Sequence, residues 1–430
     1  MKTLKRINLL NLCQIFYLIM FIGKVRTICL ACLLASFSSC SAGQKQNNSE
    51  QPGQVADVKN EQAADGLPHF DIQKDYPKRT VLLDELASIE YIPLETTDDA
   101  LIRQVTEIAM SGDEMLVCDK PTGNVLFYTP QGKLKKVFNK QGGGPHEYQN
   151  LTEFSADFAH KEFYVWDYQL RYAIQVYSME GDYLRTLPVK AKVWAGMLFD
   201  CDEKHLLAYD DYGLSDLSAT QFNEYPYILI DKQTGQLSPL PLRLQHRLGK
   251  SFSIGGYFMS LNLEPMLKNS GNGVVISDFA KDSVFVLRGE SLVPIATRSH
   301  IGKDDSGMDL SAVCVLTDRY MLLDDVRLNI PRGQKGDVEI AGSKSLLCDR
   351  KSGEVSEVVF RLKDLDANFF DVVSHNSRND LPDNLYMYTL RVETLLDLLE
   401  ANKLSGRLKE VAQGLNPEDN PVLVAVKFAE

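Results

Sequence analysis

The chain has 430 residues with 58 acidic and 46 basic side chains, and its formal net charge is −12. A surface with this excess of negative charge repels phosphate backbones, so we expect no nucleic-acid partner. The length could hold two or three average domains, but a single all-β domain can take most of it. No motif of a zinc protease, serine hydrolase, P-loop or EF-hand occurs, so nothing points directly to catalysis.

The first 39 residues have the composition of an export signal. They contain five basic and no acidic residues, and two apolar runs, Ile7–Gly23 and Ile28–Phe37. A basic start, an apolar stretch and small residues before a cleavage point are typical of a secretory leader. The second run continues as "SSC", which resembles a bacterial lipobox. We therefore predict a signal peptide over residues 1–39 and lipidation of Cys40.

Three alternatives to this interpretation stay open. Met20 begins a compact signal by itself and could be the true start, and Cys32 is a second candidate for lipidation. The 17 residues of Ile7–Gly23 could also remain as a membrane helix, although this length is at the lower limit for spanning a bilayer. Without residues 1–39 the net charge changes from −12 to −17, so we expect membrane attachment only through acyl chains.

Residues 40–66 are predicted to be the lipidated cysteine and a disordered tether. Ser41–Gly66 contains no aromatic residue, no leucine and no isoleucine, so it cannot bury a core. As a random coil this stretch spans roughly 25–30 Å. The tether would separate a globular body, residues 67–430, from the membrane.

The body contains a repeated pattern of alternating strands. Five times an apolar run ends in an aspartate, and the successive spacings are 48, 43, 68 and 46 residues. A second alternating run follows most of these aspartates, and it ends at a glycine turn in several units. Alternation, turn, alternation and glycine turn describe an antiparallel meander of the size of a propeller blade. The repeated residues are Asp119, Asp167, Asp210, Asp278 and Asp324, with glycines Gly132, Gly181, Gly235 and Gly353.

The fold predicted from this repeat is all-β: a six-bladed β-propeller of four-stranded antiparallel blades, with two short helices near the C-terminus. A single blade cannot bury its own faces, whereas a ring of blades leaves only short outer edges. The sixth blade would contain "NLYMYTLRVE" and "NPVLVAVKF", and Arg79–Thr96 would pair with these C-terminal strands and close the ring. Val392–Leu415 has helical spacing and forms the two helices. The other five blades are expected near residues 105–138, 151–187, 193–243, 252–297 and 310–360.

The repeat is similar to a known pattern. Gly142–Leu184, which opens with "GGGPHEY" and contains "YVWD" and "IQVY", resembles one NHL repeat. Pro68–Glu430 resembles the six-bladed NHL-like β-propeller lipoproteins of Bacteroidota, through "GGGPHEY", "SIEYIPLET" and the C-terminal "NPVLVAVKF". The sixth blade departs from the repeat, with Thr389 in place of the aspartate. The resemblance implies an outer-membrane lipoprotein, and the lack of an acidic cluster after Cys40 favours the periplasmic side.

The repeated aspartates have two interpretations. One carboxylate per blade facing the channel would hold a hard cation such as Ca²⁺. Alternatively each aspartate accepts backbone hydrogen bonds in the turn after its strand. A recurring position indicates a recurring structural role, so we expect the turn-capping role and no resident cofactor or metal.

Two stretches carry candidate binding residues. In "WDYQLRY" the rings of Trp166 and Tyr168 with the guanidinium of Arg171 would make a platform for a sugar or peptide; the competing interpretation packs Trp166 between blades. In "GGGPHEY" His146 and Glu147 would be a base and its partner. Adjacent side chains diverge in an extended segment, so an exposed loop histidine at a blade junction is the better interpretation.

The function predicted from the sequence is that of a cell-envelope binding module. We expect a lipid-anchored outer-membrane protein, facing the periplasm, that binds a peptide, a glycan or a partner protein of the envelope without catalysis. The alternative is a hydrolase or lyase, with or without a metal, whose site at a channel mouth takes charged side chains from at least three blades. A purely structural envelope component is the third hypothesis.

Overall fold

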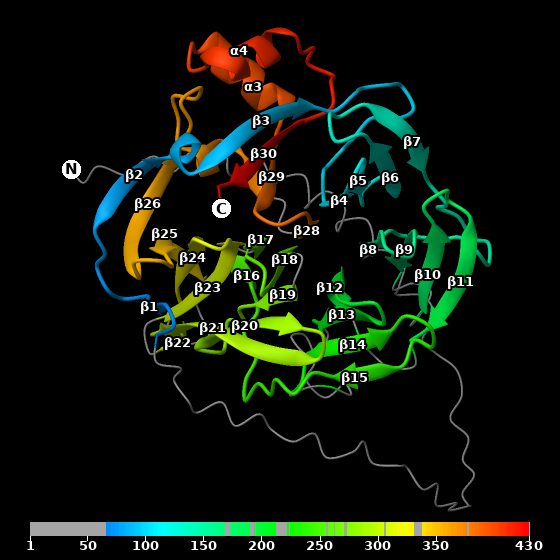
Figure 1. Ribbon diagram of the computed structural model, residues 1–430, viewed down its shortest axis with the longest axis horizontal. Helices are drawn as coiled ribbons and strands as arrows, with labels where there is room; N and C mark the ends of the chain where they lie inside the picture. Colours follow the sequence, from blue (N-terminus) through cyan, green and yellow to red (C-terminus); the bar gives the residue numbers. More distant parts are fainter. Residues whose placement is uncertain are drawn as a thin grey trace, which may run out of the picture.

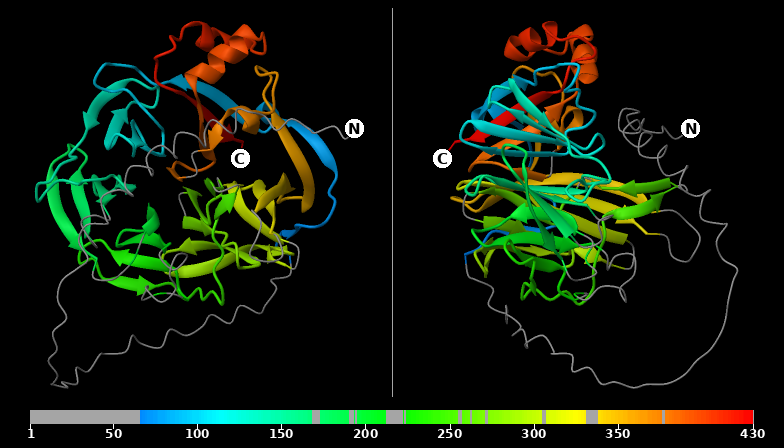
Figure 2. Two further views of the ribbon diagram at one scale, coloured as in Figure 1. Left: turned by 180° about the vertical axis from the view of Figure 1, so that it is seen from behind. Right: turned by 90° about the vertical axis from the view of Figure 1, so that its right-hand side faces the viewer.

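The computed structural model describes residues 66–167, 173–189, 193, 195–211, 222, 224–254, 257–261, 263–270, 273–304, 307–330, 338–375 and 378–429. Six four-stranded antiparallel blades form a ring around a central channel (Figure 1), which confirms the predicted fold. The outermost strands follow the circumference of the ring, and two helices stand at one edge of it (Figure 2).

The first three blades are regular meanders whose strands follow one another from the channel outward. Neighbouring strands within each of these blades pair antiparallel; for example, Val117 lies opposite Ile108 on one side and Leu126 on the other. Their strands are β4 (Glu107–Ser111), β5 (Glu114–Asp119), β6 (Asn124–Tyr128) and β7 (Leu134–Phe138); β8 (Glu153–Asp157), β9 (Glu162–Trp166), β10 (Ala173–Ser178) and β11 (Tyr183–Pro188); β12 (Ala195–Asp200), β13 (His205–Asp210), β14 (Tyr227–Asp231) and β15 (Leu237–Pro239).

The fourth and fifth blades also run outward in chain order, and the sixth joins both ends of the chain. The predicted start of the fourth blade at residue 252 is too early, because residues 251–260 form a separate hairpin. The strands are β18 (Met266–Ser270), β19 (Gly273–Ile276), β20 (Ser283–Arg288) and β21 (Ser291–Ser299); β23 (Gly307–Leu316), β24 (Tyr320–Asn329), β25 (Glu339–Asp349) and β26 (Glu354–Arg361); β27 (Ser374–His375), β29 (Leu385–Leu390), β30 (Val422–Phe428) and β3 (Ala87–Pro93); the hairpin β16 (Ser251–Ile254) and β17 (Tyr257–Ser260); and the short β22 (Gly302–Lys303).

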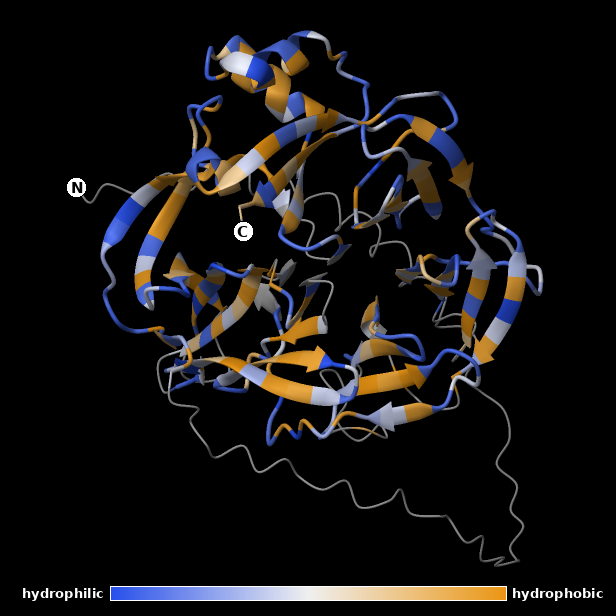
Figure 3. Ribbon diagram, in the orientation of Figure 1, coloured by the Kyte–Doolittle hydropathy of each residue, from blue (hydrophilic) through white to orange (hydrophobic). Residues whose placement is uncertain are grey.

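The core lies between consecutive blades. In β5, Met115 and Val117 pack against the sixth blade, while Leu116 and Cys118 pack against the second. Both faces of an inner strand are therefore buried, which explains why these strands read as nearly continuous apolar runs. Hydrophobic residues are concentrated in the strands and hydrophilic residues in the connections (Figure 3).

A stretch near the N-terminus, which we name the N-terminal clasp, borders three blades in succession. It consists of β1 (His69–Asp71), β2 (Lys78–Leu82) and β3, with the 3-10 turn η1 (Leu83–Glu85) between the last two. β3 pairs antiparallel with β30, so the predicted closure of the ring is confirmed for this part. The prediction is wrong for Arg79–Leu82, because β2 runs parallel to β26 of the fifth blade. β1 runs parallel to β21 of the fourth blade.

The two predicted helices are present between β29 and β30: α3 (Val392–Glu400) and α4 (Gly406–Gln413), with a single helical turn α2 (Phe369–Val372) earlier in the chain. They pack on the ring through buried side chains such as Leu395 and Leu408. The carboxylate of Asp364 accepts hydrogen bonds from the backbone N–H groups of Arg407 and Leu408, which caps α4. No helix in the described ranges is long and apolar enough to cross a membrane.

Candidate functional site at the central channel

A short strand from the last part of the chain crosses the channel. β28 (Arg378–Asp380) runs parallel to β4 of the first blade, with Asp380 opposite Ala109. It also forms a parallel bridge to β18 of the fourth blade, between Asp380 and Lys268. The first and fourth blades are opposite each other in a ring of six, so β28 spans the channel near its centre (Figure 1).

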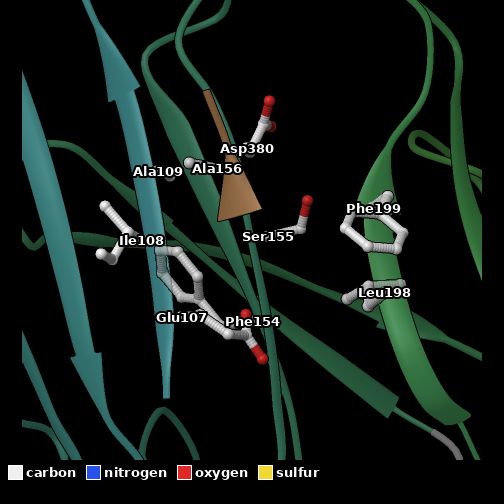
Figure 4. Close-up of a pocket in the computed structure, with 9 residues that line it drawn as sticks. All are labelled: Glu107, Ile108, Ala109, Phe154, Ser155, Ala156, Leu198, Phe199 and Asp380. Carbon is white, nitrogen blue, oxygen red and sulfur yellow. The ribbon is translucent and has the colours of Figure 1, made fainter. Parts of the chain in front are cut away.

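A small pocket lies between β28 and the inner strands of the first three blades. Its cavity volume is about 10 Å³, about the space that one water molecule needs and far below the ~300–1,000 Å³ of typical small-molecule sites. Figure 4 shows the side chains of Glu107 and Asp380 at opposite ends of this pocket, with Phe154 and Phe199 on different sides of it. Its nine lining residues are Glu107, Ile108, Ala109, Phe154, Ser155, Ala156, Leu198, Phe199 and Asp380.

Buried ion pairs connect the inner strands at the Asp380 end. Lys232 Nζ donates to Asp157 Oδ2 at 2.6 Å and to the carbonyl oxygen of Asp202 at 2.7 Å. It also forms an ion pair with Asp200 Oδ1 at 2.5 Å. Lys268 Nζ then joins Asp200 at 3.5 Å to Asp380 at 2.7 Å. The chain of charges reaches from the second blade to the fourth and to β28.

The neighbouring carboxylates keep the two buried lysines charged inside the protein. Burial alone would lower the pKa of Lys232, but Asp200 and Asp157 outweigh burial and raise it. The pKa of Lys268 is raised in the same way by Asp380 and Asp200. Burial raises the pKa of Asp380, although Lys268 acts against this. These charges therefore hold the blades together, and removing one partner would leave another buried and unpaired.

The other end of the pocket has a smaller ion-pair group. Lys120 Nζ lies 2.5 Å from Glu107 Oε1 and 3.2 Å from Glu153 Oε2. The two glutamates begin the inner strands of the first and second blades, and all three side chains are largely buried. Each end of the pocket is thus bordered by lysine–carboxylate contacts between neighbouring blades.

Sequence reasoning missed two histidine–aspartate pairs near the same inner strands. His160 Nδ1 lies 2.8 Å from Asp157 Oδ2, and His205 Nδ1 lies 3.1 Å from Asp202 Oδ2. Each pair occupies the turn after the inner strand of its blade, and each aspartate also accepts the backbone N–H of its histidine. The shared spacing Asp-x-x-His, 45 residues apart in the two blades, is the signal that could have revealed them.

The predicted residues His146 and Glu147 lie in the junction between the first two blades. His146 is exposed, and its ring stacks on that of Tyr183 with centroids 3.9 Å apart and planes 9° apart. Glu147 Oε2 accepts the backbone N–H of Gly144 at 2.7 Å. Tyr148 is buried, and its hydroxyl donates to the carbonyl oxygen of Gly123 at 2.6 Å. The loop is thus fixed by its own glutamate and tyrosine, while the histidine faces outward.

Trp166 of "WDYQLRY" does not share a surface with His146. Trp166 is only 2 % exposed, and it packs with Ile174 and Leu198 between the second and third blades. Tyr168 and Arg171 lie outside the described residues. Within the described part of the chain, the structure therefore places Trp166 in the interior and only His146 and Glu147 at the junction.

Three of the repeated aspartates accept backbone hydrogen bonds, two of them from a different segment than expected. Asp119 Oδ2 accepts the N–H of Arg103 at 2.7 Å, and Asp167 Oδ2 accepts that of Gln149 at 2.5 Å. Both donors belong to the stretch that leads into the inner strand of the same blade. Asp278 accepts the N–H of Ala280 in its own turn, as expected, and also the hydroxyl of Tyr227. Among the described residues, no three His, Cys, Asp or Glu side chains are grouped as metal ligands.

The fold and the channel define the class: a six-bladed β-propeller whose channel is crossed by its own chain. Residues 67–427 match a family described as a domain of unknown function, DUF4934, and the chain belongs to this family. No curated protein matches the chain.

A solved structure with a similar fold comes from Bacteroides fragilis. A Bacteroides fragilis protein described as a predicted exported protein is 15% identical, with a TM-score of 0.57 over 84% of this chain and 99% of that chain. A member of the DUF4221 family from Bacteroides vulgatus is 9% identical, with a TM-score of 0.44 over 80% of this chain and 97% of that chain. At 15% identity the first likeness shows the fold alone.

Proposed function

We propose that this chain is a cell-envelope propeller that binds a peptide, a glycan or a partner protein on the outside of the ring. The observation that carries this proposal is the occupied channel. β28 crosses it, the charged side chains around it pair with one another, and its pocket of about 10 Å³ is too small for a peptide or a glycan. A peptide or glycan would therefore contact loops and strand edges on the outer surface.

The junction between the first two blades is the proposed contact region. The stacked rings of His146 and Tyr183 offer a flat surface with polar edges, of the kind on which sugars and peptides pack. The loop that carries His146 is held in place by the hydroxyl of Tyr177, which donates to the carbonyl oxygen of His146 at 3.0 Å. A fixed loop loses less conformational entropy when a ligand binds.

The proposed location is the periplasmic side of the outer membrane, with a lipid anchor at Cys40. The signal-like residues 1–39, the lipobox-like "SSC" and the tether composition support this location. The Bacteroides fragilis protein of similar fold is also described as an exported protein. The resemblance to NHL-like propeller lipoproteins supports the same assignment. The net charge of −17 makes acyl chains the only expected contact with an anionic membrane.

Binding is tested with arrays of envelope glycans and of immobilised peptides, using the purified mature chain. His146→Ala and Tyr183→Ala should each weaken the binding of any hit at least tenfold, because each removes one ring of the stacked pair. His246→Ala is the matched control, since His246 is also an exposed loop histidine. Equal binding by all variants would contradict the proposed contact region, and the absence of any hit would contradict the proposed ligand classes.

The anchor is tested by metabolic labelling with an alkyne-bearing fatty acid, followed by mass spectrometry of the mature N-terminus. Cys40→Ser should abolish the label, whereas Cys32→Ser should retain it. A labelled Cys40→Ser variant would refute the assigned lipidation site.

A second candidate function, acid–base catalysis at the channel mouth, is favoured by one observation. His160 is 49 % exposed at its side chain and is oriented by Asp157 through Nδ1, which leaves Nε2 as the atom that can exchange a proton with a substrate. Charged side chains from three blades lie near this pair. Incubation with the array hits and mass spectrometry of the products tests it: cleavage that is lost in His160→Gln supports catalysis, and intact ligands contradict it.

A further inference from the structure

We propose that the outer edge of β11 binds an extended peptide, which adds to the second blade as a further strand parallel to β11. This strand is the outermost of its blade (Figure 1), and within the described part of the chain it pairs only with β10. Because β11 carries Tyr183 of the stacked ring pair, the inference rests on the function proposed above and specifies its ligand. The backbone donors and acceptors of a strand edge suit a peptide rather than a glycan.

The chain itself shows that a short strand can add to an outer edge of this fold. β1 runs parallel to β21, and β2 runs parallel to β26. At the first of these edges the backbone N–H of Thr297 donates to the carbonyl oxygen of Pro68 at 2.9 Å. Each added strand also buries one apolar side chain, Phe70 in β1 and Val81 in β2. Three to five extended residues are thus enough for this kind of addition.

β11 has the same local form as the edge that receives β1. Each strand has one extra residue in its register with the next strand inward, Leu184 in β11 and Ile295 in β21. Two positions further along lie Thr186 in β11 and Thr297 in β21, the residue whose N–H bonds to the clasp. We therefore expect the N–H of Thr186 to point outward as well. No hydrogen bond joins the backbone of Tyr183–Leu187 to any described segment other than β10.

The open edges of the first and third blades are less suited to strand addition. β7 carries Lys135 and Lys136, and the N–H of its first residue, Leu134, already donates to the carboxylate of Glu95 at 2.7 Å. β15 has only three residues and ends in a proline. Lysines, prolines and short length protect a sheet edge. β11 has six residues and exposes 43 % of Leu184, so it is the least protected of the three.

Two residues define how much of the β11 edge is available. Pro188 ends it, because the carbonyl oxygen of Pro188 lies against the turn of the third blade at Gly235. The charge of Arg185 does not guard the edge, because its guanidinium pairs with the carboxylate of Glu162 at 2.7 and 2.8 Å. An added strand can therefore align with Tyr183–Leu187.

The surroundings of the edge define the ligand as a peptide with basic residues before an apolar stretch. Two exposed acids, Glu180 and Asp182, directly precede β11, and in a parallel strand the first residues of the peptide lie near them. Lys136 is close to both acids, but its ammonium donates to the carbonyl oxygen of Met179. The net charge of −12 also disfavours an acidic peptide. The exposed side chain of Leu184 offers an apolar contact to the residues that follow.

Fluorescence anisotropy of the mature chain with a labelled synthetic peptide tests the proposal. The probe is KRTVLL, the sequence of Lys78–Leu83, which has the required composition and adds in parallel to β26 in its own chain. It should bind, and EETVLL should bind at least tenfold more weakly. N-methylation of alternate backbone nitrogens should abolish binding in one set of positions and spare it in the other, because only every second N–H faces β11. Equal effects of both sets, or no binding of KRTVLL by the folded chain, would overturn the proposal.

Variants assign the peptide to β11 rather than to β26 in place of the clasp. Thr186→Pro removes the outward N–H and should weaken binding at least tenfold, whereas Thr186→Ala keeps this N–H and should lose less. Leu184→Lys adds a charge of the kind that β7 carries and should also weaken binding at least tenfold. Leu101→Lys, at an exposed leucine before β4, is the matched control and should bind like the wild type. Thermal unfolding verifies that each variant is folded, and unchanged binding in folded Thr186→Pro and Leu184→Lys would refute the assigned edge.

His146→Ala separates this inference from the contact region proposed above. If His146→Ala weakens binding of KRTVLL while Thr186→Pro and N-methylation do not, the stacked rings bind the peptide and strand addition is refuted. If Thr186→Pro weakens binding and His146→Ala does not, strand addition stands and the contact region at the stacked rings is refuted.

Discussion

The first three blades and the last three are held in the ring by different contacts. In the first three, the turn before the outer strand carries a glycine with positive φ that packs on the outer strand of the preceding blade: Gly132 on Pro93, Gly181 on Phe138 and Gly235 on Pro188. The corresponding glycines of the fourth and fifth blades, Gly289 and Gly353, have no neighbour within 4 Å of an added Cβ. In that half of the ring the N-terminal clasp borders the outer edges instead.

The two halves of the ring thus cover the outer edges of their blades and join neighbouring blades in two different ways. The first three blades use contacts between neighbours in the sequence, about 45 residues apart. The clasp joins residues more than 200 positions apart, for example Phe70 with Arg298 and Val81 with Phe360. Contacts of long sequence separation form slowly because the intervening loop must close first. The first half of the ring can therefore assemble locally, whereas the second half needs both ends of the chain.

Removal of the first two clasp strands is the strongest test of this difference. A chain that begins at Ala87 lacks β1 and β2, and with them the buried side chains of Phe70, Ile72, Val81 and Leu83. Burial of four such side chains contributes roughly 6–12 kcal/mol, which is comparable to the stability of a whole domain. We expect this chain to be insoluble or partly unfolded, measured by circular dichroism and urea denaturation.

A chain that begins at Gly66 keeps the whole clasp and serves as the control, with unchanged stability. If the shorter chain unfolded at the same urea concentration as this control, the clasp would be dispensable. Hydrogen exchange would then also show undiminished protection in β21 and β26.

The repeat in the sequence predicted the blades because it records the contacts between them. Both faces of β5 are buried, so "MLVC" is apolar throughout, and the turn after β6 requires glycine because a Cβ at Gly132 would meet the backbone of Pro93. These requirements recur in every regular blade. The closing strand β3 was predicted because the strand-like stretch that contains "SIEYI" lies before the first full unit of the repeat.

The channel could not be predicted in the same way. β28 has three residues and bridges strands of opposite blades, so no periodicity marks it. Lys232 follows a strand like many surface lysines, and only the arrangement of the blades brings it to Asp157, 75 positions away. Trp166 has a residue type suited to binding, yet strand alternation directs it into the core between blades.

Loss of the buried lysine between the second and third blades should have the next largest effect. Lys232→Met leaves Asp157 with His160 alone and Asp200 with the more distant ammonium of Lys268 alone. Breaking such a buried pair costs about 3–5 kcal/mol, measurable by urea denaturation. The double variant Lys232→Met with Asp157→Asn should recover part of this loss, because one unpaired charge is gone. A Lys232→Met variant as stable as the wild type would show that the pair adds nothing to the junction.

Alanine substitutions of the turn glycines compare the two halves of the ring directly. Gly132 and Gly353 have similar positive φ values, +83° and +74°, so alanine at either position incurs the left-handed cost of about 1–2 kcal/mol. Only at Gly132 would the new Cβ also collide with the neighbouring blade, which adds about 1–3 kcal/mol. Gly132→Ala should therefore be clearly less stable than Gly353→Ala in thermal unfolding. Equal effects would mean that the contact between the turn and the preceding blade is not a constraint.

The smallest expected effect concerns a buried acid in the second half of the ring. Asp325 on β24 is 3 % exposed, and its Oδ1 has no hydrogen-bond partner. Burial first, and then the neighbouring charge of Asp309, raise its pKa to about 7, although the cations of Lys344, Arg298 and Arg327 act in the opposite direction. Lys344 also donates to the carbonyl oxygen of Ile72, so this buried group lies beneath the clasp.

The direction in which Asp325 makes the stability of the fold depend on pH follows from proton binding. The raised pKa means that the folded protein keeps the Asp325 proton between about pH 4 and pH 7, where the unfolded chain has already lost it, so stability falls as the pH rises through this range. Between pH 6 and pH 8 this amounts to about 1 kcal/mol, and Asp325→Asn should abolish that part of the pH dependence in urea denaturation. Glu90→Gln, on the exposed face of β3, should keep it. Identical pH profiles for Asp325→Asn and the wild type would show that the charge beneath the clasp is compensated by Lys344 and the two arginines at every pH.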